Sequence, residues 1–67
     1  MQITLEAARR NAHLTQAEAA KMLKISEKTL QNYEAGRSFP TIPVLKRIEE
    51  LYRIKYDDLI FLQEDYS

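Results

Sequence analysis

The chain has 67 residues, no cysteine and equal numbers of basic and acidic side chains. A chain of this length forms one small domain, and without cysteine it has neither disulfides nor thiolate metal sites. No apolar run approaches the roughly 20 residues that span a bilayer, and Glu6, Arg9 and Arg10 interrupt the N-terminal stretch that a signal peptide would need. We therefore expect a soluble, cytoplasmic protein with no membrane partner.

The charges are unevenly distributed along the chain. Residues 1–47 carry eight Lys or Arg and four Asp or Glu, whereas residues 48–67 carry two and six. A basic body with an acidic end can present one positive face although the net charge is zero. The alternative is ordinary solvated charge on helix surfaces, and the charge pattern alone does not decide between the two.

Apolar residues recur at spacings of three and four along the chain, which is the helical period. Taken in chain order, they predict five helices in a single domain that covers residues 1–67. The ranges are about 4–11, 15–23, 26–34, 42–52 and 56–62. We therefore expect an all-α fold, a compact five-helix bundle.

Helix-start signals support these ranges unequally. Thr15 and Glu18 form a Thr-x-x-Glu capping box at the second helix, and Ser26 is a favourable N-cap for the third. The fifth helix has no such cap, and would depend on Asp57 and Asp58 near the positive end of its dipole. The first four helices are therefore better supported than the fifth.

The second and third predicted helices are separated by only about three residues, 23–25. So short a turn forces the helices to cross steeply, and Ala20 supplies the small side chain that a close crossing needs. The outer face of the third helix then stays free for polar side chains that suit a groove about 12 Å wide. This arrangement is a helix-turn-helix. The polar residues on that face are Glu27, Lys28, Gln31 and Asn32.

A longer pattern surrounds this turn. It comprises residues 14–20 (LTQAEAA), 23–26 (LKIS), 29–30 (TL) and 33–37 (YEAGR), with Pro40 and the later core positions Leu45, Ile48, Leu51 and Leu59. From Leu5 to about Leu62 the chain resembles the lambda-repressor and Cro-like (XRE) helix-turn-helix family. The resemblance implies a five-helix bundle whose third helix reads double-stranded DNA. It also implies a transcriptional repressor that binds a twofold-symmetric operator as a homodimer.

The resemblance also implies base contacts at the start of the third helix. There Lys28 can donate to guanine O6 and N7, Glu27 can accept from cytosine N4, and Asn32 can pair with adenine. Gln31 is a weaker candidate. For Glu27 the alternative is an ordinary first-turn acid that the helix dipole favours.

Other positions are implied as phosphate contacts or as structural links. Gln16, at the start of the second helix, matches a phosphate contact of the family, although the alternative is a local role in the capping box. Arg9 and Glu34 match an internal ion pair that orients the third helix. Further phosphate candidates are Ser26, Thr29, Arg37 and Lys24, with Lys46 and Arg47 less certain.

Two turns depart from the family pattern. Lys24 and Arg53 occupy positions where glycine is common. A left-handed conformation costs a non-glycine residue roughly 1–2 kcal/mol. Either these turns are slightly strained or their backbone differs.

Catalytic chemistry finds no support in the sequence. The single histidine, His13, is expected at an exposed helix end, and we expect no enzyme activity, cofactor, metal or small-molecule ligand. The rival function is an antitoxin or another protein-interaction module on the same fold.

The segment 59–62 (LIFL) bears on that rival function, because four successive apolar residues cannot all face one small core. A homodimer interface that uses Ile60, Phe61 and Tyr66 is one interpretation. A hydrophobic lid over the core and a surface for a different protein are the alternatives.

Overall fold

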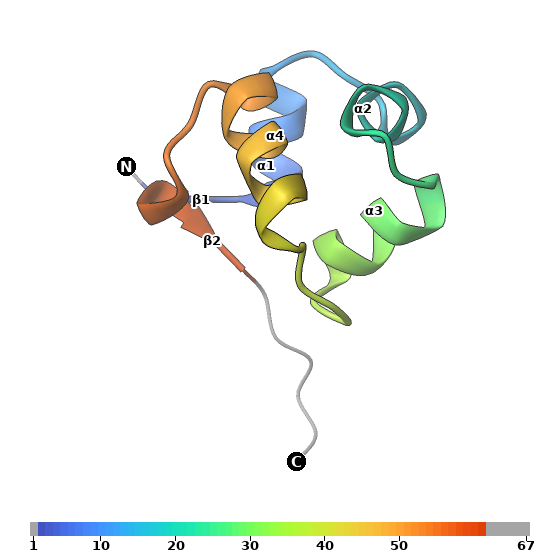
Figure 1. Ribbon diagram of the computed structural model, residues 1–67. Helices are drawn as coiled ribbons and strands as arrows, with labels where there is room; N and C mark the ends of the chain where they lie inside the picture. Colours follow the sequence, from blue (N-terminus) through green and yellow to red (C-terminus); the bar gives the residue numbers. More distant parts are fainter. Residues whose placement is uncertain (1, 62–67) are drawn as a thin grey trace.

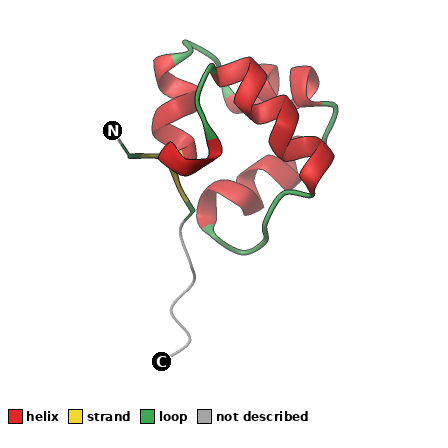
Figure 2. Cartoon of the chain, turned by 60° about the vertical axis from the view of Figure 1, so that its left-hand side comes forward, coloured by secondary structure: helices red, strands yellow, loops and turns green. Residues whose placement is uncertain are grey.

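The computed structural model describes residues 2–61. Four helices pack around one another, and a short two-stranded sheet lies beside them near the N-terminus (Figures 1 and 2). The four helices differ from the predicted ranges by no more than one residue at either end. In chain order the elements are β1 (Ile3–Thr4), α1 (Leu5–Asn11), α2 (Gln16–Leu23), α3 (Glu27–Ala35), α4 (Ile42–Tyr52), the 3₁₀ turn η1 (Tyr56–Asp58) and β2 (Leu59–Ile60).

The predicted fifth helix is wrong over the described residues. After the turn η1 the chain extends, and β2 pairs in parallel with β1, Ile3 opposite Leu59 and Thr4 opposite Ile60. Leu59 is 7% exposed and Ile60 is 39% exposed, which is the alternation of a strand rather than of a helix. No side chain caps the turn. The fold therefore keeps its helical class with four helices and not five, and Leu62 lies outside the described residues.

Local capping explains where three of the helices begin. The Thr15 hydroxyl accepts from the Glu18 N–H at 3.1 Å, and the Glu18 carboxylate accepts from the Thr15 N–H at 3.0 Å. Thr4 and Ser26 likewise accept from the N–H three residues on, at 3.1 and 3.0 Å. At α4, Thr41 makes no such bond, and a proline in the first turn favours the start of the helix instead.

The two turns that lack glycine keep the left-handed backbone. Lys24 ends α2 at φ 61°, ψ 41°, and Arg53 ends α4 at φ 54°, ψ 50°. The helix ends are thus built as they would be with glycine, at some conformational cost. Gly36 ends α3 in the same region, at φ 82°.

The core brings α2, α3 and α4 together. Leu23, Leu30 and Ile48 are completely enclosed, and Ala19 and Ala20 leave room for close packing beside them. In Figure 1 α2 is viewed nearly along its axis whereas α3 lies across the view, so the two helices cross steeply. This crossing, fixed by the turn at Lys24, holds α3 against the body along one side only.

Within residues 2–61, no helix is both long enough and apolar enough to cross a membrane. In the same part of the chain no three His, Cys, Asp or Glu side chains gather in a way that would hold a metal ion.

Candidate nucleic-acid interface

The helix α3 has one buried and one open side. Leu30, Tyr33 and Glu34 are buried against the body of the protein. On the open side Glu27 and Lys28 are exposed, and Gln31 and Asn32 are partly exposed. The four side chains predicted to read bases therefore share the outer side of one helix.

The end of α3 joins one of these residues to a predicted phosphate contact. Arg37 Nη1 donates to Asn32 Oδ1 across 3.4 Å at the protein surface. The Asn32 amide thereby keeps its NH₂ group turned to other partners, and Arg37 lies at the same end of the outer face.

At the beginning of α3 two predicted phosphate contacts already take part in the cap. The Ser26 hydroxyl accepts from the Thr29 N–H, and the two hydroxyl oxygens lie 2.7 Å apart. One hydroxyl proton joins this pair, so the other remains available as a donor. Lys24, in the turn just before, is exposed.

Gln16 belongs to a hydrogen-bonded network that links α1, α2 and α3. Its Nε2 donates to Glu34 Oε1 at 3.0 Å. Arg9 Nε donates to Glu34 Oε2 at 2.8 Å, and Arg9 Nη2 reaches Glu34 Oε1 at 3.3 Å. Arg9 Nη1 also donates to the Leu14 carbonyl at 2.9 Å. The Arg9–Glu34 pair expected from the family resemblance is thus in direct contact, but its link to Gln16 was not foreseen.

The charges in this network affect neighbouring groups. The hydrogen bond to Glu34 raises the pKa of Arg9, although burial acts in the opposite direction. Burial, and then the charge of Glu34, raises the pKa of the Tyr52 phenol to about 12. The ion pair therefore stays charged and Tyr52 stays neutral at ordinary pH. Among the described residues the buried Tyr52 hydroxyl has no hydrogen-bond partner.

A second surface feature was only partly anticipated. An apolar groove of about 520 Å³ lies beside α4 and the loop before it. Phe39 and Ile42 are 57% and 67% exposed, and the Phe61 ring lies 5.7 Å from that of Phe39. Of the interface residues predicted from sequence, Ile60 is exposed, Phe61 lines the groove, and Tyr66 lies outside the described residues. The lining comprises Phe39, Pro40, Ile42, Leu45, Tyr56 and Phe61.

Sequence reasoning missed Phe39, Ile42 and Tyr56 as part of this surface. The available signal was a large apolar residue in or beside each connection that flanks α4. Periodicity does not reveal such residues, because it detects helix faces and not loops.

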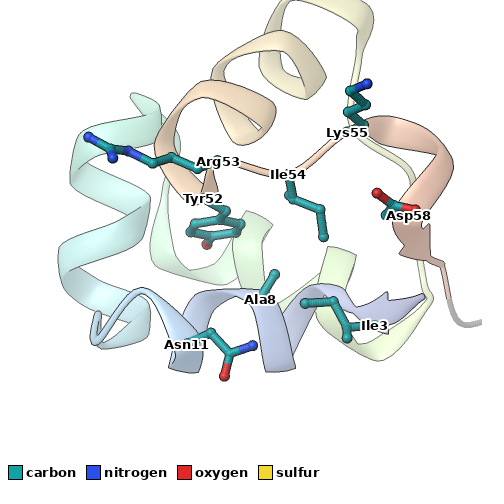
Figure 3. Close-up of a pocket in the computed structure, with 8 residues that line it drawn as sticks. All are labelled: Ile3, Ala8, Asn11, Tyr52, Arg53, Ile54, Lys55 and Asp58. Atoms are coloured by element: carbon teal, nitrogen blue, oxygen red, sulfur yellow. The ribbon is translucent and has the colours of Figure 1, made fainter. Parts of the chain in front are cut away.

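A hollow of about 510 Å³ lies elsewhere, between α1 and the segment that follows α4. Figure 3 shows Ile3, Ala8 and Asn11 on one side and Tyr52, Ile54 and Asp58 on the other, with the charged ends of Arg53 and Lys55 extending outward. None of these lining residues belongs to α2 or α3. The hollow is therefore separate from the outer face of α3.

The steep α2–α3 crossing and the polar outer face of α3 define a helix-turn-helix domain. The family model described as helix-turn-helix matches residues 5–59. The chain belongs to this Cro/CI-like (XRE) family of DNA-binding transcription regulators. A comparison with curated proteins found no match.

Proposed function

We propose that the protein is a transcriptional repressor of the Cro and phage-repressor type, acting in the bacterial cytoplasm. The observation that carries the proposal is the outer face of α3, where four polar side chains project from a helix anchored on its other side by Leu30 and Tyr33. A helix presented in this way enters the major groove and reads base edges. Occupation of a promoter by such a domain blocks transcription without any further activity.

In the proposed complex, base contacts come from the middle and the start of α3. Lys28 and Asn32 donate to base acceptors, Glu27 accepts from cytosine, and Gln31 adds a weaker contact. Phosphate contacts surround this face and fix its register on the duplex. These come from Gln16, Lys24, Ser26, Thr29 and Arg37.

We propose further that two copies bind a twofold-symmetric operator. The exposed apolar groove beside α4 supports a homodimer, because a cluster of large apolar side chains is costly to leave in water. The same groove favours the second candidate function, in which an antitoxin or similar module binds another protein. Analytical ultracentrifugation of the pure protein, with and without operator DNA, distinguishes these proposals. A species of twice the monomer mass supports the homodimer, whereas a monomer in both conditions contradicts it.

Selection of bound sequences from a pool of random duplex DNA tests the proposed function. We expect a consensus of two half-sites related by twofold symmetry, with centres one helical turn apart. An unselective pool, or no retained DNA at low ionic strength, would contradict sequence-specific regulation.

A further inference from the structure

Gln16 is held in place by the recognition helix α3. Its amide nitrogen carries two N–H groups, and Nε2 lies 3.0 Å from Glu34 Oε1. The side chain is only partly buried. One N–H is therefore used inside the protein, and the other is available for a partner outside it.

The acceptor of this hydrogen bond is itself rigid. Glu34 is 7% exposed, and Arg9 contacts both of its carboxylate oxygens, at 2.8 and 3.3 Å. Arg9 is anchored in turn by the Leu14 carbonyl in the loop that leads into α2. The carboxylate therefore has one orientation, and the Gln16 amide that donates to it has one as well.

Charge is also balanced at this point. A bare carboxylate close to the DNA backbone would repel the phosphates. The guanidinium of Arg9 neutralises Glu34 at contact distance. Glu34 thus serves as an acceptor near the duplex without opposing binding of the DNA.

We propose that Glu34 is a positioning residue for DNA binding, which holds one amide N–H of Gln16 so that the other N–H points at a backbone phosphate. The inference rests on the proposed function, since it assigns a specific task within the phosphate contacts. It gives the buried ion pair a second role beyond joining α1 to α3. The benefit is an amide whose rotamer freedom is lost before DNA arrives, so that binding does not have to pay for it.

A pair of matched variants separates positioning from stability. Arg9→Met/Glu34→Gln removes the ion pair but keeps an acceptor oxygen for Gln16, whereas Arg9→Met/Glu34→Leu removes both. Neither leaves a buried unpaired charge. Each is prepared with and without Gln16→Ala, and thermal denaturation establishes that it is folded. Dissociation constants are then measured for the selected duplex and for its single-base variants.

We expect Gln16→Ala to weaken all duplexes alike, by about 3- to 10-fold, in the wild type and in Arg9→Met/Glu34→Gln. In Arg9→Met/Glu34→Leu that loss is already present, and adding Gln16→Ala changes affinity less than about twofold. The proposal is overturned if Gln16→Ala costs the same in both paired backgrounds. It is also overturned if the Glu34→Leu pair loses discrimination at particular base pairs, because that result indicates a tilted α3.

The wild-type protein provides a measurement that needs no variant to fold. In nuclear magnetic resonance spectra the two side-chain N–H protons of Gln16 should differ, one being protected by Glu34 and the other shifting when the selected duplex is added. Two equivalent protons, or no shift with bound DNA, would overturn the positioning role and leave the proposed function standing. Failure of the wild type to bind any duplex would overturn both.

Discussion

Arg9 and Glu34 join the first helix to the recognition helix through a buried ion pair, in which Arg9 Nε lies 2.8 Å from Glu34 Oε2. The side chains are 10% and 4% exposed. Both charges have lost most of their water, so each depends on the other for compensation. Removing one partner is therefore a different perturbation from removing both.

Glu34→Leu alone should lower the free energy of unfolding by about 3–5 kcal/mol, because it leaves Arg9 buried and uncompensated. Arg9→Met/Glu34→Leu should lose far less. Urea denaturation followed by circular dichroism gives both values. As a control, Arg10→Met breaks the exposed Arg10–Glu6 pair and should change stability by about 1 kcal/mol or less. Equal losses in the single and double variants would contradict the account of the pair.

The parts of the fold that follow from local signals could be predicted from sequence. Thr15, Glu18 and Ser26 mark helix starts through bonds to residues three positions away, and such bonds are written into the local sequence. Tyr33 was expected in the core from its spacing relative to Leu30, and it is buried.

The errors and omissions come from contacts between distant residues. β2 forms because β1, more than 50 residues earlier, offers a strand edge, and apolar periodicity near Leu59 contains no trace of that partner. The Gln16–Glu34 bond joins side chains 18 positions apart. Its existence depends on how α2 and α3 cross, which short-range patterns do not specify.

Lys24→Gly should affect stability and DNA binding in opposite directions. Lys24 has φ 61°, and relief of the left-handed strain should exceed the added entropy of glycine, for a net gain of about 0.5–1 kcal/mol in the free energy of unfolding. Loss of the proposed phosphate contact should weaken all duplexes and reduce the salt dependence by about one charge. Urea denaturation and salt titration measure the two effects.

Lys21→Gly is the matched control, because Lys21 lies inside α2 and glycine there should cost about 1 kcal/mol. If Lys24→Gly is as destabilising as Lys21→Gly, the assignment of strain to the turn is wrong.

Glu18 should make stability depend on pH. Accepting hydrogen bonds from Thr15, the backbone N–H foremost, lowers the pKa of Glu18 below its ordinary value of 4.5. A carboxyl with a lowered folded-state pKa stabilises the protein fully above the unfolded value and loses that contribution as the pH falls through the folded value. Denaturation of wild type and Glu18→Gln, compared from neutral pH down to about pH 3, should show their difference shrinking. A difference that stays constant or grows would contradict the capping role.

The most direct test of the recognition surface on α3 is the affinity of Lys28→Ala for the selected duplex and for every single-base variant of it. Lys28 is exposed on the outer face of the helix, where a donor to guanine has no structural task inside the protein. We expect the variant to lose about 1–3 kcal/mol of discrimination at one base pair in each half-site and to keep its preferences elsewhere. A loss that is uniform over all sequences, or no change at all, would contradict base reading by this face of α3.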